Sequence, residues 1–354
     1  MGNKDRSDRV PARTMRPQAR SRLIRPAMIA AALLGLALVV YLIVASGAED
    51  VARAMLSVGW GLAAITAFHL VPMILSALSW RDLLPRSSRL DVLSVTWIRW
   101  IRESINSLLP VAGVGGDVAC ARLAHLCGVP SKQAAASMVV DVTVGAATQL
   151  LYVVIGVGLL LLRSTEPAVL GLASAVLAGI AVFIVVIAAF LVLQHRGMLA
   201  LSARLAGGML RSERLSGAAG SASAVDDAVV AVYRDRIAFW RAGLVRLIGW
   251  AAGTGETWLV TQFLGQPLSL LDAFILESLG AGVRGAAFMV PGQLGILEGG
   301  YVVFGALFGL PAQAALTISL ARRVRELALG VPGLLVWHWI ETRRLLRRLL
   351  DEAS

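Results

Sequence analysis

The chain has 354 residues, of which 57% are hydrophobic and 16% are charged, and its mean hydropathy is +0.75. Apolar runs of about 20 residues recur along it, which excludes an ordinary soluble domain and indicates a polytopic helical membrane protein. The net charge of +11 does not indicate nucleic-acid binding, because the basic residues gather in the tails and in one loop, where positive-inside sorting and anionic lipid headgroups account for them.

Six apolar segments are long enough to cross a membrane as helices. They are Ala27 to Ser46, Gly59 to Trp80, Lys132 to Leu162, Pro167 to Leu193, Ala242 to Leu264 and Ala312 to Ile340. Basic tails precede the first and follow the last, and the loop between the fourth and the fifth is rich in arginine, so we place both termini and this loop in the cytoplasm, with the protein in the inner (cytoplasmic) membrane. The predicted divisions are a disordered basic tail (1–26), a first membrane half (27–193), a basic loop (194–241), a second membrane half (242–340) and a tail (341–354).

Two stretches between these spans repeat each other. They are Leu109 to Pro130 (LPVAGVGGDVACARLAHLCGVP) and Val290 to Pro311 (VPGQLGILEGGYVVFGALFGLP). One offset of 181 residues places Pro110 on Pro291 and Asp117 on Glu298, with a Gly-rich turn between proline and acid in each copy. We interpret the agreement as an internal duplication.

Each copy ends in an arm that is too short to cross the membrane. Asp117 to Gly128 and Glu298 to Gly309 have 12 residues each, about 18 Å of helix against a hydrocarbon core of about 30 Å. We therefore predict re-entrant helical hairpins whose Gly-rich turns are packed in protein or line a wet cavity. Charge counting puts the first hairpin on the cytoplasmic side and the second on the outer side. The predicted fold is all-α with two inverted repeats, the architecture of many secondary transporters.

Charged residues in the apolar segments are the candidate functional residues, because an ionisable group at membrane depth is costly and faces a cavity or another charge. Under the same offset Glu103 corresponds to Arg284, and Asp141 corresponds to Arg322. Each acid is thus matched by a base in the other half. The pattern predicts ion pairs that open and close between the halves.

The alternative is local pairing between residues four apart on one helix, which neutralises the charges without a gating role. Arg99 with Glu103 and Arg322 with Glu326 have this spacing. The full set considered for a polar path or for ion pairs is Arg99, Arg102, Glu103, Asp141, Glu277 and Arg322.

Asp117 and Glu298 are the sharper candidates, because each begins a short helix after a Gly-rich turn. A carboxylate in that position either caps the unpaired backbone donors of the first turn or contacts a substrate or exchanges a proton. The four histidines and two cysteines show no ligand spacing, so no metal or other cofactor is expected.

At these motifs the chain resembles the lysylphosphatidylglycerol synthase transmembrane-region family, also described as flippase-like proteins. The resemblance covers most of residues 27 to 340, and VVDVTVGAATQLLY, ILESLGAGVRGAAFMVPG and SLARRVRELALGVPGLLVWHWIE are most similar to the branch associated with hopanoid biosynthesis. It implies movement of lipids between leaflets, with phospholipid, hopanoid or glycolipid as partners, together with lipid-biosynthesis enzymes. The motif match assigns the lipid path to Pro110, Gly116, Asp117, Arg122, Arg284, Pro291, Gly292, Gly295, Glu298 and Gly299.

The expected function is therefore that of a lipid translocase or a lipid-transport accessory. The basic residues Arg99, Arg102, Arg122 and Arg284 are expected to attract a phosphate or another polar headgroup. The lysine-transferring members of the family add a soluble catalytic domain, and this chain ends at Ser354, so no aminoacyl transfer is expected. The alternatives are an intramembrane enzyme acting on a lipid-linked group and a non-transporting scaffold for hopanoid or lipid biosynthesis.

Overall fold

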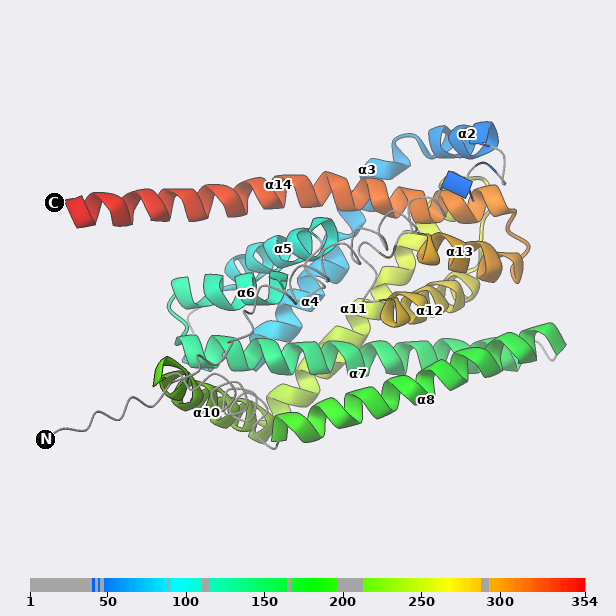
Figure 1. The fold of residues 1–354 in the computed structure, drawn as a ribbon. Helices are drawn as coiled ribbons and strands as arrows, with labels where there is room; N and C mark the ends of the chain where they lie inside the picture. Colours follow the sequence, from blue (N-terminus) through cyan, green and yellow to red (C-terminus); the bar gives the residue numbers. More distant parts are fainter. Residues whose placement is uncertain are drawn as a thin grey trace, which may run out of the picture.

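The computed structural model describes residues 40–41, 44, 48–87, 90–109, 115–163, 167–195, 213–287, 293 and 295–353, and the regular structure in these ranges is helical throughout (Figure 1). The helices are α2 (Ala48–Val58), α3 (Gly61–Phe68), α4 (Leu70–Leu83), α5 (Val92–Leu108), α6 (Gly115–Leu126), α7 (Ser131–Arg163), α8 (Pro167–His195), α10 (Glu213–Arg234), α11 (Arg236–Phe263), α12 (Leu270–Ala286), α13 (Ile296–Ala306) and α14 (Ala312–Ala353). The predicted all-α fold is confirmed for these residues. Most of the first expected span, Ala27 to Ser46, lies outside them.

Among the described residues, two helical stretches, Gly61–Leu83 and Ser131–Arg163, are long and apolar enough by length and composition to cross a membrane. Helices α11 and α14 are also long, but they carry more charge. Several of these charges are buried in the bundle: Arg246 and Glu256 on α11 are buried, whereas Leu244 and Ile248 on the same helix are exposed. Buried charge beside exposed aliphatic side chains is the reverse of a soluble surface and suits a helix that faces lipid.

The short helices begin at local caps. The Asp91 carboxylate accepts a hydrogen bond from the Ser94 N–H at 2.9 Å before α5. Hydrogen bonding to the Ser94 side chain, together with this backbone bond, lowers the pKa of the exposed Asp91 carboxyl. Before α13, Gly295 has a φ of +78°, a conformation that glycine adopts at little cost. Its N–H donates to the Glu298 carboxylate at 2.7 Å. Caps of this kind satisfy the unpaired donors of a first turn.

The helix bounds follow the offset between the two repeated stretches. Gly115 and Ile296 begin α6 and α13, Ser131 and Ala312 begin α7 and α14, and each pair is 181 residues apart. The packing is reciprocal as well: α5 packs against α14, and its counterpart α12 packs against α7. In Figure 1, α7 and α14 run in opposite directions, and α5–α6 and α12–α13 lie toward opposite ends of the molecule.

The stretch formed by α3 and α4 packs antiparallel along α11. Gly61 lies against the Phe263 ring at one end, and the Ser79 hydroxyl donates to the Ala242 carbonyl at 2.8 Å near the other. This interface lies between one apolar cluster around α7, α12 and α13 and a second around α5, α6 and α14.

Candidate functional site

Buried charged side chains gather in three neighbouring clusters inside the bundle. The Asp141 cluster consists of Ser76, Arg99, Asp141 and Arg246; the His69 cluster of His69, Glu103, Glu256 and Arg325; and the Glu277 cluster of Thr257, Glu277, Arg284, Tyr301 and Arg322. The first two clusters join side chains from both halves of the chain. At membrane depth, such groups mark candidate functional sites.

The Asp141 cluster places two guanidinium groups on one carboxylate. Asp141 on α7 is fully buried. Arg99 on α5 donates to one of its oxygens at 2.7 Å, and Arg246 on α11 donates to the other. The Ser76 hydroxyl accepts from both arginines. With the carboxylate ionised, the cluster holds one net positive charge, and the buried Nε of Arg246 finds no acceptor among the described residues.

The Glu277 cluster repeats this arrangement with different helices. The Glu277 carboxylate, on α12, accepts from Arg284 at 2.7 Å and also from Arg322 on α14. The hydroxyls of Thr257 and Tyr301 donate to it at 2.6 and 3.1 Å. Two guanidiniums again share one carboxylate. Arg284 Nη1 and Arg322 Nε are buried and have no acceptor in the described part of the chain.

The His69 cluster lies between the other two. His69 occupies the junction of α3 and α4, and its two ring nitrogens lie 2.6 Å from the carboxylates of Glu103 on α5 and Glu256 on α11. Arg325 on α14 donates to Glu256 and also lies 2.7 Å from the His69 Nδ1. The cluster therefore contains two acids, one arginine and one histidine.

The three clusters adjoin one another along α5, α11 and α14, and together they are called the polar track. Arg99 and Glu103 are one turn apart on α5, and Arg322 and Arg325 are about one turn apart on α14, which is about 5 Å of rise. Glu256 lies on α11 next to Thr257 of the Glu277 cluster. The track leads from the side of α5 and α7 to the side of α12 and α13.

The hairpin acids lie beside this track and have different partners. Asp117 on α6 forms an ion pair with Arg102 on α5. Glu298 on α13 completes the cap at Gly295 and lies 3.3 Å from Arg323 on α14. Glu298 thus has the helix-capping role that was considered for both acids. Asp117 instead contacts the side chain of Arg102.

A comparison with protein families matches the chain to the family described as "Lysylphosphatidylglycerol synthase TM region" over residues 28–333. The chain belongs to this family. Membership confirms the resemblance to the family as a whole, without distinguishing its branches, and implies a membrane protein with a lipid-related function. Comparisons with curated proteins and with solved structures gave no match.

The family-motif residues are distributed over several environments. Pro110, Pro291 and Gly292 lie outside the described residues. Gly116 allows close approach, since a Cβ there would collide with the Arg102 carbonyl oxygen, and its N–H donates to Asn106 at 2.8 Å. Gly299 has open space where a Cβ would lie. Arg122 pairs with Glu341 near the end of α14 at 2.8 and 3.0 Å, away from the buried track.

The prediction of ion pairs between equivalent positions of the two halves is wrong. Glu103 pairs with His69 rather than with Arg284, and Asp141 pairs with Arg99 rather than with Arg322. The alternative, pairing between residues four apart on one helix, is wrong too, because Arg99 pairs with Asp141 on α7 and Arg322 pairs with Glu277 on α12. Side chains one turn apart on a buried helix meet different neighbouring helices, so the nearest opposite charge lies across an interface.

Four residues of the clusters were not among the candidates drawn from the sequence. Arg246, Glu256 and Arg325 are buried in these clusters, and His69 joins two carboxylates. Their signal was a charge or a histidine inside an otherwise apolar span. No grouping of three or more His, Cys, Asp or Glu side chains suited to a metal occurs in the described ranges.

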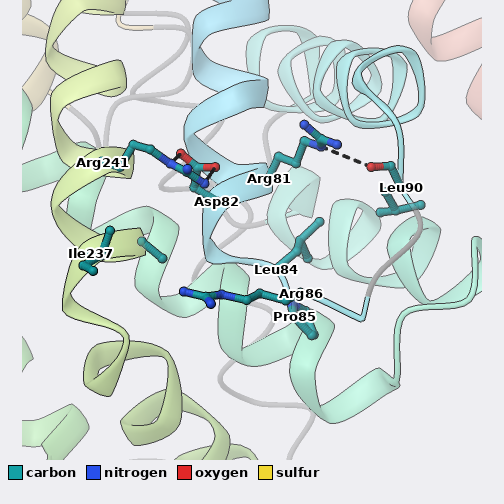
Figure 2. A pocket seen from close by; sticks show the side chains of 9 residues that line it. Arg81, Asp82, Leu84, Pro85, Arg86, Leu90, Ile237 and Arg241 are labelled. Atoms are coloured by element: carbon teal, nitrogen blue, oxygen red, sulfur yellow. Dashed lines mark hydrogen bonds and ion pairs between the residues drawn. The ribbon is translucent and has the colours of Figure 1, made fainter.

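A basic pocket of about 310 Å³ opens where α4 ends and α11 begins (Figure 2). Arg81, Arg86 and Arg241 line it together with one carboxylate, Asp82. Figure 2 shows Arg241 turned to Asp82 and Arg81 turned to the Leu90 carbonyl, at 3.2 Å from its Nε. Helices α4 and α11 continue from this pocket to the Asp141 cluster.

Proposed function

We propose that the chain is a flippase-like lipid translocase of the inner membrane, which moves an anionic headgroup between leaflets through the space between its two halves. The observation that carries the proposal is the excess of buried guanidinium over carboxylate in the Asp141 and Glu277 clusters. Each holds two arginines and one acid, and three of the guanidinium N–H groups find no acceptor among the described residues.

A phosphodiester headgroup suits these clusters chemically. It carries one negative charge, and each cluster has one positive charge in excess. Its oxygens accept hydrogen bonds from guanidinium groups in forked geometry. A buried donor without an acceptor costs free energy, which a bound phosphate would recover. A neutral hydroxylated lipid, such as a hopanoid with a polyol headgroup, would leave the excess charge unbalanced. The clusters therefore favour an anionic phospholipid.

The proposed framework is a pair of inverted repeats, with α5–α6 and α12–α13 as hairpins that enter from opposite sides. The reciprocal packing of α5 on α14 and of α12 on α7 supports it. So does the antiparallel packing of α3–α4 on α11, which are counterparts under the same offset. In transporters with this design the substrate site lies between the repeats near the membrane midplane.

The proposed path begins at the basic pocket between α4 and α11. Arg81, Arg86 and Arg241 would attract a headgroup from the cytoplasmic leaflet. The headgroup would then pass to the Asp141 cluster and on to the Glu277 cluster, which lies beside the second hairpin. Rocking of the halves would expose the two clusters in turn. No bond is made or broken in this proposal, and the chain is assigned no catalytic step.

The test measures leaflet exchange of headgroup-labelled phosphatidylglycerol in liposomes that contain the purified protein. The variant combines Arg246→Gln with Arg284→Gln, which removes the excess charge and leaves the Asp141–Arg99 and Glu277–Arg322 pairs in place. We expect exchange by the parent and a loss of at least about tenfold in the variant, since one charge-assisted hydrogen bond contributes about 1.5–3 kcal/mol.

The matched control is Arg53→Gln, because Arg53 is exposed on α2 and pairs only with nearby acids on the same helix in the described structure. It should exchange lipid like the parent. A hopanoid bearing the same label should move more slowly than phosphatidylglycerol. Absence of exchange for every lipid, with a folded parent, would reject translocation and favour the scaffold or the enzyme.

A further inference from the structure

We propose that His69 is a proton-binding site which couples proton movement to the passage of the anionic lipid, a proposal that rests on the translocase function above. On gaining or losing the proton at Nδ1, the ring exchanges its contact with Arg325 for its contact with Glu256. The coupled substrate is a proton, and the transported pair of proton and anionic headgroup carries no net charge.

The first observation is that both ring nitrogens of His69 face carboxylates. Nε2 lies 2.6 Å from Glu103 Oε1, and Nδ1 lies 2.6 Å from Glu256 Oε1. An ionised carboxylate only accepts hydrogen bonds. Both contacts are satisfied together only when both nitrogens carry a proton, which is the imidazolium form.

The second observation is a contact of His69 Nδ1 that requires the opposite protonation state. Arg325 Nη1 lies 2.7 Å from the same Nδ1, and a guanidinium only donates. This contact is satisfied only when Nδ1 has a free lone pair, which is the neutral ring with its proton on Nε2. The Nδ1 atom is therefore placed for two incompatible partners, each of which suits one protonation state.

The two protonation states differ in the helix to which Nδ1 of His69 is hydrogen-bonded. In the imidazolium form Nδ1 donates to Glu256 on α11, while Arg325 stays bound to Glu256. When the Nδ1 proton leaves to water, the lone pair accepts from Arg325 on α14 instead. Nε2–H continues to donate to Glu103 in both states. One proton is released, and no other bond to hydrogen changes.

The charge of the cluster changes with the proton. The groups that face His69 are Glu103 from α5, Glu256 from α11 and Arg325 from α14, and Glu326 lies 3.8 Å from Arg325. Considering the four residues of the cluster, imidazolium gives no net charge and neutral imidazole gives one negative charge. Because the clusters on either side are each positive by one, a deprotonated His69 cluster would repel an anion between two sites that attract it. Protonation removes this barrier.

A route for the proton is also present. The His69 side chain is 10% exposed, whereas the side chain of Glu103 that contacts it is 41% exposed. Glu103 thus connects the enclosed imidazole with the surface of the bundle. Nδ1 itself faces Glu256, whose side chain is only 4% exposed, so the imidazolium gives its Nε2 proton to Glu103, and tautomer exchange of the neutral ring returns the remaining proton to Nε2, which leaves Nδ1 without one.

The first experiment measures exchange of labelled phosphatidylglycerol between about pH 5 and pH 10, a range wide enough to include the titration of a histidine that lies between two carboxylates. The proteins are the parent, His69→Gln, and His338→Gln as the control at an exposed position on α14. We expect parent exchange to fall with rising pH, by up to about tenfold per pH unit as for one required proton. The His338→Gln protein should behave like the parent, and His69→Gln should lose the pH dependence.

The second experiment reads the proton directly and does not depend on transport. Nitrogen NMR of histidine-labelled protein in micelles reports the protonation of Nδ1, and the His69 signal is the one missing from His69→Gln. We expect Nδ1 to lose its proton within the same pH range. At one intermediate pH, Arg325→Gln should retain the proton and Glu256→Gln should lose it, because each variant removes the partner of one state.

The outcomes separate the two proposals. Exchange by the parent at a rate that is the same at every pH, with one His69 state throughout, would overturn the proton site and leave the translocase standing. No exchange with any lipid, beside a clear His69 titration that responds oppositely to the two variants, would reject the translocase and retain the proton site. No exchange and a His69 signal that does not titrate would overturn both.

Discussion

Glu277 neutralises one of the two guanidinium groups beside it, so the charge balance of its cluster depends on this one side chain. Replacing it by glutamine would leave Arg284 and Arg322 buried together without a counter-ion. Removing one partner from a buried ion pair costs about 3–5 kcal/mol. We expect Glu277→Gln to lower the free energy of unfolding by this amount, measured by thermal or denaturant unfolding in micelles.

Two further variants give this measurement its control. Asp50→Asn makes the same chemical change in an exposed pair with Arg53, where ion pairs contribute about 0–1 kcal/mol, so its stability should stay close to that of the parent. Adding Arg284→Gln to Glu277→Gln removes one of the two uncompensated charges. The double variant should be more stable than Glu277→Gln alone, and equal or lower stability would show that charge balance is not what Glu277 supplies.

At the scale of helices, close packing depends on glycines that face hydroxyl side chains. A Cβ added at Gly156 on α7 would collide with Ser278 on α12, and one added at Gly333 on α14 would collide with Ser104 on α5. The two reciprocal interfaces are thus built alike. Small residues of this kind let transmembrane helices approach closely.

Gly156→Ala should therefore force α7 and α12 apart. We expect a loss of about 1–3 kcal/mol, the usual cost of overpacking, measured as a lower unfolding temperature in micelles. Gly158→Ala is the matched control two residues away, where no atom lies within 4 Å of an added Cβ. There the better helix propensity of alanine should raise stability by up to about 1 kcal/mol. Equal effects at both positions would mean that the contact with Ser278 is not tight.

Helix bounds were the most predictable part of the fold. The Gly-Val-Pro and Gly-Leu-Pro sequences before Ser131 and Ala312 end one helix and begin the next, and this turn chemistry is local in the chain. The 12-residue arms were expected, and α6 and α13 have 12 and 11 residues. Helix α10 within the basic loop and the continuation of α14 to Ala353 were not expected, because amphipathic or charged helices give no apolar signal there.

Pairing of charges was the least predictable part of the site. The partners of His69 lie 34, 187 and 256 residues away in sequence. An offset between repeats relates equivalent positions, but contact requires facing positions, and these are set by the rotation and crossing of packed helices. The sequence therefore indicated which charges matter, such as Asp141 and Glu277, without indicating which base each would meet.

At the scale of the whole molecule, the proposed duplication and the packing together constrain how the chain lies in the membrane. Counterpart helices α4 and α11 pack antiparallel, and α7 and α14 run in opposite directions (Figure 1). Helices related by a duplication run antiparallel when the repeats are inverted. The ends of α6 and α13 should then face opposite sides of the membrane.

Single cysteines at these two ends test the arrangement. Cys127 is exposed just after α6, and Ala306 is exposed at the end of α13. One protein keeps Cys127 and has Cys120→Ser, and the other carries Ala306→Cys with both native cysteines replaced by serine. We expect a membrane-impermeant thiol reagent to label Ala306→Cys in intact cells and Cys127 only in inverted vesicles.

A protein without cysteines is the control for non-specific reaction. Cys127 should lie on the same side of the membrane as a tag at the C-terminus, because the basic tail is expected in the cytoplasm. Labelling of both positions from one side would show that the repeats are parallel. The proposed exposure of the Asp141 and Glu277 clusters to opposite leaflets would then have no structural basis, whatever the lipid.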